Sequence, residues 1–252
     1  AKILRNERGP ASIITANNVF AHVDDLIGFT HGVRELLAED GVFIFEVSYL
    51  VDVYEKTLFD TVYHEHLSYH SVGPLCQYFK AQGLELIEVT RIKTHGGSLR
   101  GIAQLSSGHR KVSKSVVNLI NLESKLKLDK AYTLKHYSNK IDKLKQKIQL
   151  QLYDLKKSGK SIIGYGAPAK ATTLMYHFGL GTHILDFIVD DSPLKQGLYS
   201  PGLHVPILSR SAINDKKPDY ILILAWNFAS SIIKNNRKFS EFGCKYFIPL
   251  PE

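Results

Sequence analysis

The densest group of side chains able to move protons lies in residues 61–70, which read TVYHEHLSYH. The stretch holds three histidines, two tyrosines and a glutamate, and it fits a catalytic cluster, a metal site or a structural cluster of histidines. His64 and His66 are two residues apart and would share one face of an extended chain, which could suit zinc. A metal site also needs a third ligand and supporting groups, and His22 or His95 would have to supply that ligand.

Acid–base chemistry is the third interpretation of the same residues. Histidine titrates close to neutral pH and can take a proton from carbon or oxygen. A carboxylate such as Glu65 can orient an imidazole and raise its basicity. A hydroxyl such as that of Tyr63 can donate a hydrogen bond to a developing oxyanion. These are the groups needed to remove a proton beside a carbonyl and to stabilise the resulting enolate.

The composition is that of an ordinary globular protein, with 44% hydrophobic and 22% charged residues in a chain of 252. The two cysteines, Cys76 and Cys244, match no zinc spacing and exclude a disulfide framework. Residues 110–160 hold 14 Lys and Arg against four acids, a net charge of +10, so the rest of a chain with a total of +8 is near neutral. The lysines of this stretch alternate with leucine and isoleucine at helical spacing. A solvated helix face explains this better than nucleic-acid binding, since no aromatic residues interleave with the lysines as a stacking platform would require. No apolar run is long enough to cross a bilayer and no signal peptide is evident, so we expect a cytoplasmic protein without a membrane or nucleic-acid partner.

The elements that must position these residues follow an α/β order. We expect a buried strand at Ser12–Ala16, a helix from Asp24 or Asp25 to Leu37, and a turn at Asp40–Gly41 before the next strand. A helix closed by Gly83 follows. The strand after it, a glycine turn and a further strand then form an antiparallel hairpin. Apolar residues from Leu134 to Leu155 recur at a spacing of three to four, which predicts a long amphipathic helix.

These elements predict an α/β fold in three parts: the C-terminal half of a Rossmann-like sheet over residues 1–108, a helical connector over 109–158, and a second, small Rossmann-like domain over 159–252.

A glycine turn in the last part resembles a dinucleotide fingerprint. Gly164 and Gly166 follow a strand, and Asp190 comes some 24 residues after the turn. The third glycine of the fingerprint is missing and Pro168 opens the helix, so a compact strand-to-helix turn explains the pattern about as well. Lys170 at the helix start could meet a phosphate or a partner carboxylate.

Five stretches taken together give a more specific resemblance. The stretches NNVFAHVDDL, YHEHLSYHS and HGGSLR, followed by GYGAPAKATTLMYHFGL and FIVDDSPLKQGLYSPG, resemble the nucleotide-sugar C-methyltransferases that make branched-chain deoxysugars. The resemblance covers essentially the whole chain. It implies that the first sheet is the C-terminal half of a methyltransferase catalytic domain, and that the enzyme uses S-adenosylmethionine.

The resemblance also implies the site residues. It places His22, Tyr63, Glu65 and His66 in the active site, with His66 or His22 as the base that removes the C3 proton of a nucleoside-diphosphate 4-keto deoxysugar. Tyr63 and the loop near Asn17 and Asn18 would stabilise the enolate oxygen, while His64 occupies a variable position. The remaining residues that we expect to bind substrate are His95, Gly96, Gly97, Ser98, Arg100, Tyr165 and Lys170.

The same family has a four-cysteine zinc domain and a glycine-rich S-adenosylmethionine loop, neither of which is found in this sequence. We expect both to precede Ala1, so zinc is expected only in that region and this chain would hold no metal. The rival hypothesis is a non-catalytic nucleotide-sugar or dinucleotide-binding Rossmann-like module.

Overall fold

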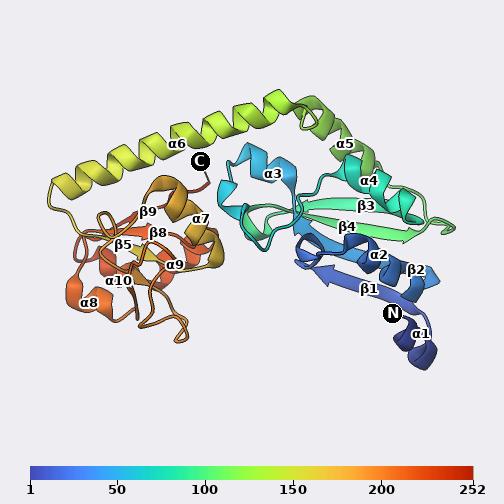
Figure 1. Ribbon diagram of the computed structural model, residues 1–252, viewed down its shortest axis with the longest axis horizontal. Coiled ribbons are helices and arrows are strands. Elements are labelled where there is room, and N and C mark those ends of the chain that lie inside the picture. Colours follow the sequence, from blue (N-terminus) through green and yellow to red (C-terminus); the bar gives the residue numbers. More distant parts are fainter. Residues whose placement is uncertain (252) are drawn as a thin grey trace. The chain divides into compact units, whose positions relative to one another are not determined.

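The computed structural model describes residues 1–251. The chain folds into two compact units (Figure 1). Unit 1 contains residues 1–55 and 64–136, and unit 2 contains residues 56–63 and those from Tyr137 onward. The short segment 56–63 therefore folds with the C-terminal unit although unit 1 residues flank it on both sides.

Unit 1 consists of a four-stranded sheet with helices and short 3-10 turns. Its elements are α1 (Lys2–Arg8), β1 (Ala11–Asn17), η1 (Phe20–His22), α2 (Leu26–Leu36), β2 (Leu37–Ser48), α3 (Leu50–Glu55), α4 (Val72–Ala81), β3 (Leu84–Ile92), η3 (Thr94–Gly96), β4 (Ser98–Leu105) and α5 (Lys114–Leu126). The strand order is β1-β2-β4-β3, with β1 parallel to β2 and the other pairs antiparallel. The predicted hairpin of the last two strands is confirmed.

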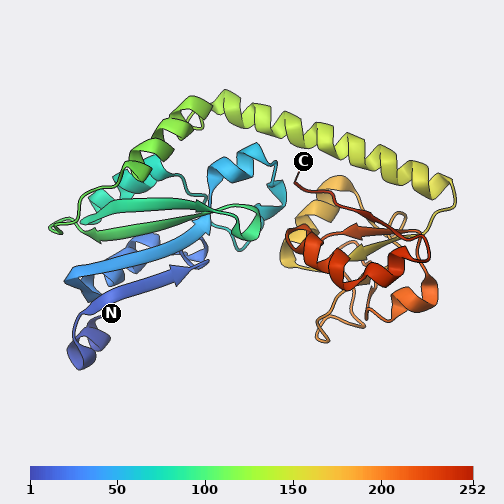
Figure 2. The same cartoon turned by 180° about the vertical axis from the view of Figure 1, so that it is seen from behind.

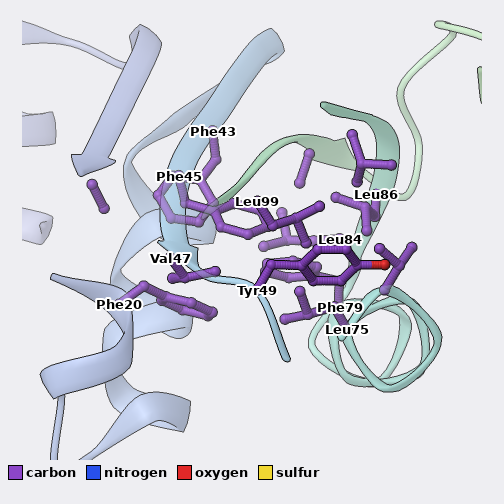
Figure 3. Close-up of a cluster of buried hydrophobic side chains, with 14 of the residues drawn as sticks. Phe20, Phe43, Phe45, Val47, Tyr49, Leu75, Phe79, Leu84, Leu86 and Leu99 are labelled. Carbon is purple, nitrogen blue, oxygen red and sulfur yellow. The ribbon is translucent and has the colours of Figure 1, made fainter. Parts of the chain in front are cut away.

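The core of unit 1 lies on one face of this sheet. Alternate residues of β2, Phe43, Phe45 and Val47, are buried, as expected where one face of a strand is covered. They pack with Phe20 from η1 and Phe79 from α4, and Figure 3 shows these side chains as one group. Aromatic residues thus attach the turn that ends at His22 firmly to the sheet.

Two details of the first strands differ from expectation. β1 is largely exposed rather than buried, with Ile13 62% exposed and only Ala16 buried. The expected turn at Asp40–Gly41 is wrong, because β2 runs continuously from Leu37 and its pairing with β1 contains an irregularity there. A Cβ on Gly41 would lie 2.7 Å from the Ala11 carbonyl oxygen, so this glycine serves a close approach of two strands.

The helix caps follow the sequence more closely. Asp25 is the N-cap of α2, and its carboxylate accepts a hydrogen bond of 2.8 Å from the Gly28 N–H. Gly83 follows α4 with a φ of +76°, which agrees with its expected role at the helix end.

The expected helical connector contains two helices. α5 ends at Leu126, and α6 (Ala131–Lys157) begins after a break at residues 127–130, where Lys127 is left-handed. The predicted long amphipathic helix is confirmed in α6, whose Leu144, Ile148 and Leu152 are buried in the core of unit 2. None of the helices in residues 1–251 is both long and apolar enough to span a membrane.

Unit 2 is a second α/β layer structure, also visible from behind in Figure 2. Its five parallel strands have the order β7-β6-β5-β8-β9. Its elements are η2 (Phe59–Thr61), β5 (Ile162–Tyr165), α7 (Ala169–Phe178), β6 (Ile188–Val189), β7 (Ile207–Leu208), α8 (Ala212–Lys216), β8 (Tyr220–Ile223), η4 (Trp226–Phe228), α9 (Ala229–Asn235), α10 (Arg237–Ser240) and β9 (Lys245–Phe247).

Neighbouring residues of the central strand of unit 2 face opposite sides. Ile162 packs with α7 and the end of α6, whereas Ile163 packs with α8, α9 and α10. Helices on both faces of a parallel sheet are the Rossmann-like arrangement that the sequence predicts, so the α/β prediction is confirmed.

Candidate active site

The loop at the carboxyl end of β1 carries the first expected site residues. Asn17 ends the strand, and Asn18 adopts a left-handed φ of +54° while its N–H donates to the Glu46 carbonyl at 2.9 Å. Both asparagine side chains are exposed. The chain then turns through η1 and presents His22 beyond the buried Phe20.

His22 and His66 come together despite a separation of 44 residues in the sequence. Their ring centroids lie 4.6 Å apart at an angle of 84°, an edge-to-face arrangement. Leu67 and Ser68 donate backbone hydrogen bonds to the Ala21 carbonyl, which fastens the histidine-rich segment to η1. The structure therefore brings these two expected catalytic residues into contact.

The tautomer of His22 follows from its partner. Nδ1 lies 2.6 Å from the backbone carbonyl oxygen of Glu65. A carbonyl only accepts hydrogen bonds, so a neutral His22 must carry its proton on Nδ1. The lone pair then resides on Nε2, the atom that a general base requires.

Glu65 contributes through its backbone rather than its carboxylate. Its side chain is 54% exposed and lies 4.0 Å from the imidazole of His64, which is 82% exposed. The carboxylate was expected to orient an imidazole, but the group that bonds His22 is the Glu65 backbone carbonyl. Across residues 1–251 no three His, Cys, Asp or Glu side chains are grouped to hold a metal ion.

His70, the last histidine of the segment, is a core residue. It is 7% exposed, its ring stacks on Phe20 at 5.2 Å, and its backbone forms a β-bridge with Tyr49. Its Nε2 lies 3.1 Å from the Ser68 hydroxyl oxygen. Burial lowers the pKa of His70 to about 4, because the charged imidazolium is poorly solvated there.

We expect His70 to make unit 1 sensitive to acid. Because its pKa is about 4 when folded and about 6.5 when unfolded, it stabilises the fold above pH 6.5, and that stability is lost as the pH falls towards 4. The loss amounts to about 3 kcal/mol. Urea unfolding followed by circular dichroism from pH 7.5 to 4 should show a flatter profile for His70→Phe, whereas the exposed His109→Gln should follow the native profile. Identical profiles for His70→Phe and the native protein would contradict this assignment.

Tyr63 belongs to unit 2, whereas His22, Glu65 and His66 belong to unit 1. Its side chain is half-buried, and its N–H donates to the Thr61 carbonyl at 3.1 Å. It lies at the end of the segment that packs on α7. The four residues expected to be catalytic are thus distributed over two units.

The HGGSLR motif forms a tight turn between β3 and β4. His95 is exposed and left-handed, at a φ of +52°, and Gly96 has a φ of +94°. Gly97 has a φ of +149°, and a Cβ there would lie 2.1 Å from Cγ of Asp52, so only glycine fits. The Ser98 hydroxyl is buried and donates to the Thr94 carbonyl.

A carboxylate that sequence reasoning missed lies beside this turn. Glu46, 6% exposed, accepts hydrogen bonds from Thr94 Oγ1 at 2.6 Å and from Arg100 Nη2 at 3.1 Å. Glu46 and Arg100 are direct cross-strand partners, so the expected substrate-binding arginine already has a counter-charge. The signal in the sequence is an acid within the apolar run VFIFEVSYL.

A crevice of about 380 Å³ opens in unit 2 at the carboxyl ends of β5, β6 and β8. The buried Tyr165 places its hydroxyl within hydrogen-bond distance of Asp191 and of Asn236. Desolvation raises the pKa of Tyr165, so it remains a neutral hydrogen-bonding group. Lys195 and Arg210 line the same crevice, which is where open α/β sheets bind ligands.

The side chain of Asp190 bonds to the backbone of the turn that contains Gly164 and Gly166. The Asp190 carboxylate accepts the Ala167 N–H at 2.7 Å and the Ser192 N–H at 2.9 Å, and it pairs with Lys195 at 3.3 Å. A Cβ on Gly166 would lie 2.5 Å from Cβ of Ala225. These groups are used within the fold and do not fit the ribose of an adenosine cofactor, which favours the compact-turn interpretation.

Lys170 meets a carboxylate. Its ammonium lies 3.9 Å from Oδ2 of Asp60 and 3.7 Å from the ring centroid of Trp226. The same Asp60 oxygen accepts the indole N–H of Trp226 at 2.5 Å. Burial lowers the pKa of Lys170 to about 8 and raises that of Asp60.

Two protein families match parts of this chain. Residues 93–251 match the family described as C-methyltransferase C-terminal domain, and residues 2–89 match the one described as methyltransferase domain. The C-methyltransferase NovU of Streptomyces niveus is 34% identical over 249 residues, which is 99% of this chain and 59% of the relative. A chain in the solved complex of the Haloferax volcanii Trm112 methyltransferase activator is 14% identical, with a TM-score of 0.33, over 40% of this chain and 55% of its own.

The first family match spans more than half of the described sequence and includes the HGGSLR turn, the glycine turn and Lys170. The relative extends the similarity over β1, η1 and the His22–His66 pair, although this chain spans only 59% of its length. By these matches the chain belongs to the C-methyltransferase family.

Proposed function

We propose that the protein methylates carbon 3 of a nucleoside-diphosphate 4-keto deoxysugar, with S-adenosylmethionine as the methyl donor. Membership of the C-methyltransferase family supports the reaction class. The observation that supports the mechanism is the hydrogen bond from His22 Nδ1 to the Glu65 carbonyl, because it leaves Nε2 as a base in an exposed loop. The sugar and the nucleotide rest on the motif resemblance.

His22 removes the C3 proton in this mechanism. The ketone at C4 acidifies the adjacent C–H bond, and the electron pair of that bond forms an enolate whose negative charge lies on the C4 oxygen. His22 Nε2 accepts the proton while Nδ1 stays bonded to the Glu65 carbonyl. His66 packs edge-to-face with His22, and this contact limits rotation of the His22 ring.

Hydrogen-bond donors must stabilise the enolate oxygen. The exposed Asn17 and Asn18 follow β1 in the same loop as His22, and Tyr63 is proposed as a further donor. S-adenosylmethionine would supply an electrophilic methyl group on its sulfonium. Transfer of that group to C3 would restore the C4 ketone and release S-adenosylhomocysteine. No residue of this chain is assigned to hold that donor, since the glycine turn at Gly166 does not fit it.

The reaction is tested with methyl-¹³C S-adenosylmethionine and the full-length protein. A nucleoside-diphosphate 4-keto deoxysugar should acquire a labelled methyl group bonded to C3, seen by nuclear magnetic resonance. The same sugar nucleotide reduced to the 4-hydroxyl should acquire none, because it has no ketone to acidify the C–H bond. A label on oxygen, or equal labelling of both sugars, would contradict enolate chemistry.

A further inference from the structure

Segment 56–63 is held to unit 2 by apolar and polar contacts. The Phe59 ring lies 5.2 Å from that of His177 and 5.0 Å from that of Phe178, and Leu58 is buried in the same core. Thr173 on α7 donates its hydroxyl hydrogen bond to the Val62 carbonyl. This segment directly precedes the histidine-rich residues 64–70.

A buried charge lies at the centre of this attachment. Asp60 is fully buried, and its Oδ2 is shared between the Trp226 indole N–H and the Lys170 ammonium. Lys170 also lies over the Trp226 ring, a cation–π contact. Burying a carboxylate and an ammonium costs several kcal/mol each in desolvation, so such a pair contributes little net stability but strongly disfavours arrangements that separate it.

The connection from this charge to Tyr63 is short. Asp60 lies in η2, where the Thr61 hydroxyl donates to the Leu58 carbonyl at 2.8 Å and the Tyr63 N–H donates to the Thr61 carbonyl at 3.1 Å. Three residues span at most about 10 Å even when extended, and these hydrogen bonds shorten and fix the path. The position of the Tyr63 backbone therefore follows that of Asp60.

We propose that Asp60, Lys170 and Trp226 are positioning residues for Tyr63 in the methyl transfer. This role rests on the proposed function. It assigns the lysine of the GYGAPAK motif to an internal carboxylate rather than to a substrate phosphate, and it gives the single tryptophan of the chain a role in holding that carboxylate. Lys170 and Trp226 act through the segment and touch no reacting atom.

A double-mutant cycle in the full-length protein tests the proposal. Lys170→Met should lower kcat about 10-fold and leave the KM for the sugar nucleotide within about 2-fold, because Tyr63 acts on the transition state. Tyr63→Phe should also lower kcat, and the two changes together should cost little more than the larger one alone. Trp226→Phe, which removes the indole N–H together with the pyrrole part of the ring, should act in the same direction. The exposed Lys157→Met on α6 serves as the matched control.

Two kinetic outcomes would overturn the role. A raised KM with unchanged kcat in Lys170→Met would show that the lysine binds substrate. Fully multiplicative effects of Lys170→Met and Tyr63→Phe would show that Lys170 does not act through Tyr63.

Hydrogen exchange of the amides of residues 57–63 examines the attachment without any substrate. Lys170→Met and Trp226→Phe should speed this exchange at least about 10-fold, whereas Lys157→Met should not. Unchanged exchange would show that Lys170 and Trp226 do not hold segment 56–63 in place, and would leave the proposed function untouched. Absence of methyl transfer in the unmodified protein would overturn the proposed function, and the positioning role with it.

Discussion

Replacing His22 by Asn is expected to slow hydrogen exchange at C3 of a 4-keto sugar nucleotide by a factor of about 100 or more, the usual scale for loss of a general base. In the proposed mechanism the enolate forms before the methyl group moves, so the full-length enzyme in deuterated water should exchange this hydrogen without the methyl donor. Asn keeps a polar side chain near the Glu65 carbonyl but has no basic nitrogen. Nuclear magnetic resonance of the C3 signal measures the rate.

The neighbouring histidines supply the comparison. His66→Asn leaves Nε2 of His22 in place and removes only the ring that packs with it, so exchange should slow less, by about 10-fold. His64→Asn alters an 82% exposed side chain and should exchange at nearly the native rate. If His66→Asn exchanges the C3 hydrogen more slowly than His22→Asn, the base is His66. If both variants exchange it at the native rate, neither histidine removes the proton.

Several parts of the fold could be predicted because their signals are local. Asp25 caps α2 through a hydrogen bond three residues away, and Gly83 ends α4 with a positive φ. The apolar period of α6 follows from a single helix burying one face. Each of these depends only on neighbouring residues.

The misassigned glycine shows where local signals fail. Asp40–Gly41 has the composition of a turn, yet Gly41 lies within β2. A glycine is needed there because the backbone of Ala11, in the neighbouring strand, leaves no room for a side chain. The identity of the strand that pairs with β2 is a long-range fact, so a turn and a glycine-dependent strand contact look alike in sequence.

The candidate site was predictable only in part for the same reason. The approach of His22 to His66 follows from two loops at one edge of a sheet, which topology anticipates. The partner of Lys170 could not be foreseen, because Asp60 is 110 residues away in a segment that folds with the other end of the chain. The partner of His22 proved to be a backbone carbonyl, a group that every residue carries and that residue types do not reveal.

The second large effect that we expect concerns the stability of unit 1 and depends on Glu123. It is a buried carboxylate on α5 that accepts three hydrogen bonds from other elements. The Tyr49 hydroxyl donates at 2.8 Å, and the backbone N–H groups of Val72 and Gly73, at the start of α4, donate at 2.6 and 2.9 Å. Ser71, the N-cap residue, makes no side-chain cap of its own, so Glu123 caps the helix from a distance.

Glu123→Ala should therefore lower the free energy of unfolding of unit 1 by about 3 kcal/mol, since three buried donors lose their acceptor together. The exposed Glu39→Ala, on β2, should change it by less than about 0.5 kcal/mol. Hydrogen exchange of the α4 amides should quicken in Glu123→Ala, while fluorescence of Trp226, which lies in unit 2, should report little change in that unit. Unaltered α4 exchange would mean that water replaces the carboxylate at little cost, and that Glu123 does not hold the helix that follows the histidine-rich segment.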